Sequence, residues 1–280
     1  MFLDLKKALK FAREKKFAIP AFNVFDLEGV LSISKAASEL NALVIIQTTP
    51  KAIDYAGLNQ LFNIIKNEIH SRDLKAAIHL DHAKDFGTVR ECIDIGYNSV
   101  MIDGSALDFE SNVAVTKKVV SYASEYRVNV EAEIGNVGHE IGETGNNQNN
   151  LTVPEIAQKF VEQTGIDAVA VSVGNLHGAP KGERLNLNLL ESICEIVKIP
   201  IVMHGSSGLS HSDVQRAIQL GVAKINIDTK LKRAFLAEIM EVKDIEDDPR
   251  EILKDAIEAM SEIVKSYIKL VGADGRADEI

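Results

Sequence analysis

Short apolar runs alternate with amphipathic stretches along the whole chain, and this alternation constrains the fold more than any other feature. The runs that have the length and composition of buried strands are residues 17–24, 42–48, 76–82, 99–103, 129–135, 168–174, 199–205 and 224–228. Helical patterns between them include residues 27–40, 58–69, 113–126 and 212–220. Several runs are apolar on both faces, as in Val44-Ile45-Ile46, which is typical of parallel strands covered by helices on each side.

This order of elements predicts an α/β fold, a TIM (β/α)8 barrel. The 280 residues fit one domain of this kind, residues 1–280, with a charged helical tail from Asp244 onward. An open doubly wound sheet is the alternative architecture. No GxGxxG motif follows the first strand, which weakens the dinucleotide-binding version of that alternative.

Two helix starts carry the pattern of a capping box, in which a hydroxyl side chain closes the first turn. One is Thr152-Val153-Pro154-Glu155, and the other is Ser210 before His211-Ser212-Asp213. We therefore expect Thr152 and Ser210 to cap the helices that follow them.

Charge and composition exclude several classes of protein. The formal net charge of −10 argues against a nucleic-acid-binding face, which needs a basic surface. The chain has no apolar run that approaches the ~18 residues of a membrane span, and its start lacks the apolar core of a signal peptide. Cys92 and Cys194 lie far apart and outside metal-binding motifs, so we expect reduced thiols. The chain is thus predicted to be cytoplasmic, without nucleic-acid or membrane partners.

Three histidines, His82, His177 and His204, each stand at the end of an apolar run. In a parallel barrel the carboxyl ends of the strands meet at one face, where active sites lie. Three neutral imidazoles that converge there form a catalytic metal site with an open position, and they favour Zn²⁺. Asp81 directly precedes His82 and is placed to move a proton beside that metal.

Carboxylates at neighbouring strand ends extend this predicted site. Asp103, Glu131 and Glu133 are candidates for partners of metal-bound histidines or for a second cation site. We assign Glu133 and Asp103 to the metal site; structural salt bridges are the alternative. His79 lies inside a strand pattern, so we expect it to be a buried structural histidine that has a hydrogen-bond partner.

Glycine-rich turns after the sixth and seventh strands indicate phosphate binding. They are residues 178–182 and 205–208, and the eighth run, Asn226-Ile227-Asp228-Thr229, leads directly into a helix. Loops after the last two strands, together with a helix N-terminus, are a recurrent phosphate site in this fold. Lys181 adds a point charge there. Tight turns without a ligand are the alternative.

Taken in order, these motifs resemble those of the class II, metal-dependent fructose-bisphosphate and tagatose-bisphosphate aldolases over nearly the whole chain. The matching segments are Pro20-Ala21-Phe22-Asn23, Asp81-His82, Ser99-Val100-Met101-Ile102-Asp103-Gly104-Ser105, Glu131-Ala132-Glu133-Ile134-Gly135, Gly174-Asn175-Leu176-His177-Gly178, His204-Gly205-Ser206-Ser207-Gly208 and Lys224-Ile225-Asn226-Ile227-Asp228-Thr229. Each match is weak alone, but their number and order are specific to the family.

The resemblance implies that His82, His177 and His204 hold a catalytic Zn²⁺, and that Asp81 exchanges a proton with the C4 hydroxyl of the substrate. It also implies a monovalent cation, Na⁺ or K⁺, near the phosphate loops and a homo-oligomer, either a dimer or a tetramer. The residues assigned to substrate binding are Asn23, Thr49, Gly178, Lys181, Gly205, Ser207, Asn226, Asp228 and Thr229.

The implied reaction is the reversible aldol cleavage of a ketose 1,6-bisphosphate to dihydroxyacetone phosphate and glyceraldehyde 3-phosphate. The family takes a further base from the loop after the fifth strand, which is Glu140 or Glu143 here. Thr48-Thr49-Pro50 resembles the tagatose branch, whereas Lys181-Gly182-Glu183 and Asn226-Ile227-Asp228-Thr229 resemble the fructose branch. We favour fructose 1,6-bisphosphate, with tagatose 1,6-bisphosphate or another aldehyde partner as alternatives.

Two other functions compete with this one. A barrel-type metallohydrolase would need further metal ligands on the first strand, and Pro20-Ala21-Phe22-Asn23 offers no His-x-His motif. A catalytically silent barrel that only binds phosphosugars is supported by the loop after the fifth strand, which has fewer acidic residues than is usual in the family. The intact Asp81 and the three histidines argue against it.

Overall fold

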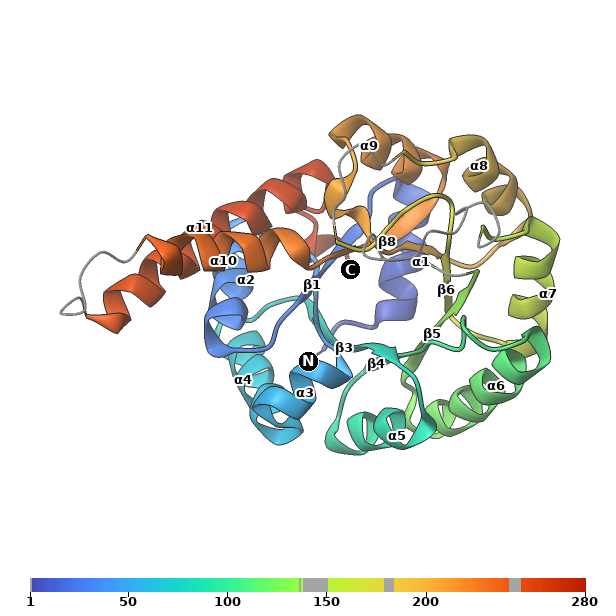
Figure 1. Ribbon diagram of the computed structural model, residues 1–280, viewed down its shortest axis with the longest axis horizontal. Helices are drawn as coiled ribbons and strands as arrows, with labels where there is room; N and C mark the ends of the chain where they lie inside the picture. The colour runs from blue at the N-terminus through green and yellow to red at the C-terminus, as the bar shows by residue number, and fades with distance from the viewer. Residues whose placement is uncertain (1, 136, 138–150, 179–183, 242–247) are drawn as a thin grey trace.

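The strands form a closed parallel barrel in this computed structural model, which describes residues 2–135, 137, 151–178, 184–241 and 248–280 (Figure 1). They are β1 (Ile19–Asn23), β2 (Val44–Thr48), β3 (Ala76–Ala83), β4 (Ser99–Ile102), β5 (Asn129–Ile134), β6 (Ala168–Val171), β7 (Ile201–Met203) and β8 (Val222–Ile227). Each strand pairs in parallel with the next along the chain, and β1 also pairs with β8. This last pairing excludes the open sheet and confirms the barrel.

Helices surround the barrel and cover the outer face of its strands (Figure 1). They are α1 (Leu5–Lys15), α2 (Leu27–Glu39), α3 (Pro50–Ala56), α4 (Leu58–Ser71), α5 (Phe86–Ile95), α6 (Phe109–Tyr126), α7 (Pro154–Thr164), α8 (Leu187–Ile196), α9 (His211–Leu220), α10 (Thr229–Met240) and α11 (Pro249–Leu270). Because each strand is covered on the outside and packed on the inside, strands such as β2, β4, β6 and β8 are buried at every position.

The predicted helical tail is α11, which packs along α2 and α10 (Figure 1). Lys265 on α11 pairs with Glu39 on α2 at 2.6 Å, and Lys35 on α2 pairs with Glu258 on α11. Together α10 and α11 project from one side of the barrel. Among the described helices, none has the length and apolar character needed to cross a membrane. Cys92 and Cys194 are both free thiols, as expected.

One of the two predicted helix caps is confirmed and the other is wrong. Ser210 accepts a hydrogen bond from the backbone N–H of Asp213 at 3.1 Å and caps α9. The Thr152 side chain does not cap α7. Its hydroxyl instead donates to the carbonyl of Ile134 at 2.6 Å and accepts from the N–H of Ser172 at 2.8 Å. Thr152 therefore joins the last residue of β5 to the residue that follows β6, and its hydroxyl satisfies two backbone groups at once.

This bridge predicts that Thr152→Val destabilises the protein more than Ser210→Ala does. The first change leaves two buried backbone groups unpaired, which costs about 1–3 kcal/mol each. The second removes one exposed cap and costs about 1 kcal/mol. Urea unfolding of both variants measures the difference. An equal or smaller loss for Thr152→Val would contradict the bridging role.

Candidate metal and substrate site

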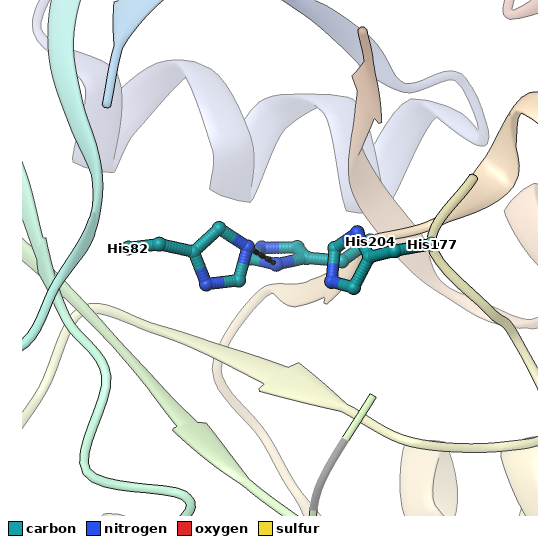
Figure 2. A group of neighbouring side chains, drawn as sticks. All are labelled: His82, His177 and His204. Atoms are coloured by element: carbon teal, nitrogen blue, oxygen red, sulfur yellow. Dashed lines mark hydrogen bonds between the residues drawn. The ribbon is translucent and has the colours of Figure 1, made fainter. Parts of the chain in front are cut away.

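The three histidines predicted as metal ligands converge at the carboxyl ends of the strands. His82 lies near the end of β3, whereas His177 follows β6 and His204 follows β7. The ring centroid of His82 is 4.6 Å from that of His204 and 5.2 Å from that of His177. One ring nitrogen of each lies within 4.8 Å of the others. Figure 2 shows the three rings side by side, with His82 and His177 reaching in from opposite sides.

A bulge in β3 aims two consecutive side chains into the same site. The pairing of β3 with β4 shifts register between Leu80 and Ala83, and His82 has a φ of 53°. In a regular strand Asp81 and His82 would point to opposite faces. Here both line one cavity. A positive φ is strained for a residue with a Cβ, and such strain is concentrated at functional sites.

Hydrogen bonds to carboxylates determine which ring nitrogens face the centre of the site. Nδ1 of His82 donates to Asp103 Oδ2 at 2.9 Å, and Nε2 of His204 donates to Glu131 Oε1 at 2.8 Å. The other two nitrogens, His82 Nε2 and His204 Nδ1, lie 2.9 Å apart (Figure 2). In neutral rings these atoms present lone pairs to each other, so a proton or a cation between them is needed to remove the repulsion.

The surrounding charges favour one positive charge between the rings. Burial lowers the pKa of His82, but the charge of Asp81 and the hydrogen bond to Asp103 outweigh burial and raise this pKa to about 9. Burial and the charge of His82 hold the pKa of His204 well below its usual value. The site thus stabilises a single cationic centre, which is the environment that a metal ion needs.

Glu133 directs a carboxylate oxygen to the same centre. Its Oε1 accepts from the backbone N–H of Val137 at 3.2 Å. Its Oε2 is buried without a hydrogen-bond partner in the described part of the chain and lies 3.6 Å from His204 Nδ1. Burial and the nearby charge of Asp103 raise the pKa of Glu133 to about 7. A buried oxygen in this position suits a neighbour or ligand of a cation.

These residues fit a divalent metal held by imidazoles. The three histidines supply the nitrogens, and Asp103 and Glu131 supply the carboxylate contacts that typically orient metal-bound histidines. A second grouping, His82 with Asp103 and Glu133, also brings ligand atoms within 4.8 Å. Asp103 Oδ2, however, already accepts from His82 and from Lys84 Nζ, the latter at 2.5 Å. The three-histidine grouping is therefore the better metal site.

Asp81 lies beside the histidines and is held by side-chain amides. Its carboxylate accepts from Asn23 Nδ2 at 2.8 Å, Asn226 Nδ2 at 3.1 Å and Gln47 Nε2 at 3.3 Å. Burial favours a higher pKa, but the positive charge of His82 and the contact with Asn23 lower the pKa of Asp81 below its usual value. Asp81 is therefore a fixed, ionised carboxylate that is suited to accept a proton.

A cavity of about 680 Å³ opens over this group of residues. The predicted site residues that line it are Asn23, Thr49, Asp81, His82, Asp103, Glu133, His177, Gly178, Gly205, Ser207, Asn226, Asp228 and Thr229. His204 contacts His82 from a fully buried position. The predicted Lys181, Glu140 and Glu143 lie outside the described residues. Every predicted residue that the structure describes thus belongs to one site.

Sequence reasoning missed four polar residues of this site. Gln47 is fully buried and contacts Asp81. The sequence feature that could have indicated it is its position as a polar residue directly after the apolar run Val44-Ile45-Ile46. Lys84, Lys232 and Arg233 line the cavity. A basic residue is ordinary on a helix surface, so Lys232 and Arg233 carried no signal until the barrel placed the start of α10 at the cavity.

Close packing at Gly205 positions the loop that carries His177. Gly205 has a φ of 60°, and a Cβ there would lie 2.4 Å from the carbonyl oxygen of Leu176 and 3.0 Å from the backbone nitrogen of His177. Any side chain at Gly205 would therefore displace the peptide that leads into His177.

Gly205→Ala is expected to weaken Zn²⁺ binding by about 10- to 100-fold, the usual effect of disturbing the groups that orient a metal ligand. Gly165→Ala is the matched control, because Gly165 has a φ of 71° and no atom within 4 Å of the added Cβ. It should lose about 1–2 kcal/mol of stability from the left-handed backbone alone and keep its metal affinity. Competition titration with a chelator measures both; equal affinities would contradict the packing role of Gly205.

The family model of class II fructose-bisphosphate aldolases matches residues 3–276. Among curated proteins, the chain is 38% identical to the D-tagatose-1,6-bisphosphate aldolase subunit GatY of Klebsiella oxytoca, over 98% of this chain and 99% of that protein. The chain belongs to the class II fructose-bisphosphate aldolase family and is a metal-dependent aldolase. This membership rules against the metallohydrolase, and the presence of Asp81 beside the three histidines argues against the silent barrel.

Solved structures agree with this assignment. The YdjI aldolase of Escherichia coli K12 superposes with a TM-score of 0.89 at 31% identity, covering 99% of this chain and 100% of that one. The fructose-bisphosphate aldolase of Campylobacter jejuni superposes with a TM-score of 0.80 at 24% identity, over 96% and 94% of the two chains. The second likeness supports the barrel fold alone.

Proposed function

We propose that this protein catalyses the zinc-dependent, reversible aldol cleavage of a ketose 1,6-bisphosphate to dihydroxyacetone phosphate and glyceraldehyde 3-phosphate. The observation that carries the proposal is the meeting of three histidine nitrogens within 4.8 Å, beside an ionised Asp81 in the same cavity. An aldol cleavage needs both parts, because one oxygen must be polarised while a hydroxyl proton is removed.

His82, His177 and His204 would hold the metal, and Glu133 would lie next to it. Zn²⁺ is favoured because neutral imidazoles suit it and three protein ligands leave a position open for the substrate. When bound, it supplies Lewis-acid stabilisation of the negative charge that develops on the substrate oxygen in cleavage. The hydrogen bonds of His82 to Asp103 and of His204 to Glu131 leave the lone pair of each neutral ring on the nitrogen that would face the metal.

Asp81 would take the C4 hydroxyl proton in the cleavage direction and return it in condensation. The three amides around it support this role because they hold the carboxylate in one orientation without giving it a proton. Asn226, which contacts Asp81 and lines the cavity, would lie against the reacting carbons. The further base, Glu140 or Glu143, stays a prediction.

The phosphate of the dihydroxyacetone phosphate half would lie against the loops after β6, β7 and β8. Gly178, Gly205 and Ser207 line the cavity, where their backbone N–H groups would bind the phosphate, and α10 begins there at Thr229. Arg233 lines the same wall and donates to the carbonyl of Gly178 at 3.1 Å. These contacts would bind the substrate at a distance from the bonds that change. Lys181 stays a predicted contributor.

A monovalent cation, Na⁺ or K⁺, is proposed near these loops. Asp228 lines the cavity, and its Oδ1 is buried without a hydrogen-bond partner among the described residues. Its other oxygen, Oδ2, accepts from Lys232 Nζ at 2.6 Å. A buried carboxylate oxygen without a hydrogen-bond partner in the described part of the chain is a suitable ligand for a hard cation.

Fructose 1,6-bisphosphate is the first candidate substrate, on the strength of the motifs 181–183 and 226–229. Tagatose 1,6-bisphosphate is the second, and the 38% identical GatY subunit favours it. The two sugars differ only in configuration at C4, where Asp81 would act. Thr49 lines the cavity within the Thr-Thr-Pro segment that resembles the tagatose branch, and side chains of this kind can discriminate between hydroxyl configurations.

We also propose a homo-oligomer, either a dimer or a tetramer. The GatY relative is named a subunit, and the exposed apolar side chains on α10 include Leu236 and Met240, of which Met240 is 82% exposed. Exposed apolar residues next to one another often mark a subunit contact. Sedimentation velocity of the purified protein would measure the assembly.

Cleavage of fructose 1,6-bisphosphate and tagatose 1,6-bisphosphate should stop after EDTA treatment and return when Zn²⁺ is restored. Coupled detection of the triose phosphates measures both reactions side by side, and the ratio of kcat/KM identifies the preferred sugar. Cleavage that persists in EDTA would contradict a metal-dependent reaction. If the zinc-loaded enzyme cleaves neither sugar, the result would point to a different aldehyde partner.

Asp81→Asn should lower kcat by about 10²-fold or more, because the amide cannot take the hydroxyl proton. The variant keeps the size of the side chain, so zinc content should stay at the wild-type level. His177→Ala should instead lose zinc and activity together. Wild-type turnover by Asp81→Asn, or full zinc content in an active His177→Ala, would contradict the assigned roles.

A further inference from the structure

We propose that Lys224 is a positioning residue for the metal site, acting through Glu131 to hold His204 in the tautomer that binds the metal. The inference rests on the proposed role of His204 as a metal ligand. Lys224 lies on β8 and its side chain is fully buried. Neither Lys224 nor Glu131 lines the substrate cavity, so the proposed reaction does not use them directly.

Lys224 is the centre of a buried polar network inside the barrel. Its Nζ donates to Glu131 Oε2 at 2.8 Å and lies 3.3 Å from His79 Nε2. Nδ1 of His79 lies 2.7 Å from the hydroxyl of Ser99. The second oxygen of Glu131, Oε1, contacts His204 Nε2 at 2.8 Å. The network therefore runs from β3 and β8 through β5 to the metal-facing histidine.

Lys224 determines the direction of its own two hydrogen bonds, because an ammonium group can only donate. Glu131 Oε2 and His79 Nε2 must therefore accept, and His79 donates through Nδ1 to Ser99. The other oxygen of Glu131, Oε1, can also only accept, so its contact requires a proton on His204 Nε2. The lone pair of His204 is then on Nδ1, the atom that faces His82.

The alternative explanation is that this network only stabilises the barrel, since a buried carboxylate needs a cationic partner. The two roles differ in what they predict for the His204 ring. If the network only stabilises the barrel, replacing Glu131 lowers stability but does not move the ring proton. A positioning network fixes that proton on Nε2 even before any metal binds.

Glu131→Gln separates these roles because glutamine has one accepting oxygen and one donating nitrogen. Lys224 can only donate, so it takes the Gln oxygen and turns the NH₂ group toward His204 Nε2. Nε2 must then accept, and the His204 proton moves to Nδ1, which blocks the metal-facing nitrogen. The double variant Glu131→Gln/Lys224→Met removes this restriction, so that the amide is free to flip and accept from Nε2 again.

The experiment combines two readouts on full-length protein. Long-range ¹H–¹⁵N spectra of ¹⁵N-histidine-labelled, metal-free protein report the tautomer of His204. Chelator competition reports Zn²⁺ affinity. Glu131→Gln should show the Nδ1–H tautomer and a loss of Zn²⁺ affinity of about 10- to 100-fold. Adding Lys224→Met should restore the Nε2–H tautomer and most of the affinity.

Thr48→Val is the matched control, because Thr48 is equally buried and its hydroxyl contacts that of Tyr97 at 2.9 Å. It should lower stability while leaving the His204 tautomer and Zn²⁺ affinity unchanged. If Glu131→Gln does not fold, the double variant carries the test, since it must fold with the wild-type tautomer.

Two results would overturn the inference: an unchanged tautomer in Glu131→Gln, or a double variant that binds Zn²⁺ as weakly as Glu131→Gln. A wild-type protein that binds no Zn²⁺ would instead overturn the proposed function, while the tautomer of the metal-free protein would still test the positioning role.

Discussion

Pairing of β1 with β8 closes the barrel, and the site depends on that closure. All strands run in parallel, so closure brings their carboxyl ends into one ring, where loops from distant parts of the chain meet. His82 and His204 are 122 positions apart in sequence, yet their ring nitrogens lie 2.9 Å apart. Asp81 likewise receives amides from β1, β2 and β8. An open sheet would separate these residues.

At the carboxyl ends of the strands, the charged side chains form two layers. The cavity face carries the carboxylates Asp81, Asp103 and Glu133 around the histidines, and they favour a cation at the centre. Behind it, buried Lys224 and Glu131 form a matched ion pair. Unpaired buried charge is costly, so each of these groups needs a partner or a ligand. The oxygen of Glu133 that has no partner within the described residues points to the same centre that a metal ion would occupy.

The alternation of apolar runs was sufficient to predict every strand and the barrel itself. The strand ends were less accurate: residues 199–205 were expected, whereas β7 is Ile201–Met203. The chain leaves the sheet at His204 because Gly205 takes a left-handed φ and packs on the loop of His177. Thr152 was misassigned as a cap because local sequence does not reveal a contact made between strand ends.

The histidines and Asp81 were predictable because strand-end polar residues are conspicuous beside apolar runs. The bulge that turns Asp81 and His82 to one side could not be predicted, since it depends on the register between β3 and β4. Gln47 and Lys224 looked like isolated polar residues in strands. Only the closed barrel shows that one contacts Asp81 and that the other reaches Glu131 across the interior. Sequence patterns thus indicated the histidines and the carboxylates beside them better than Gln47 and Lys224, which contact those carboxylates.

The most direct test of this account is X-ray absorption spectroscopy at the zinc edge of the zinc-loaded protein. We predict a first shell with three imidazole nitrogens, which would match the meeting of His82, His177 and His204. Loss of one imidazole from that shell in His177→Ala would assign the signal to this site. A shell that contains thiolate sulfur, or fewer than three imidazoles in the wild-type protein, would contradict it.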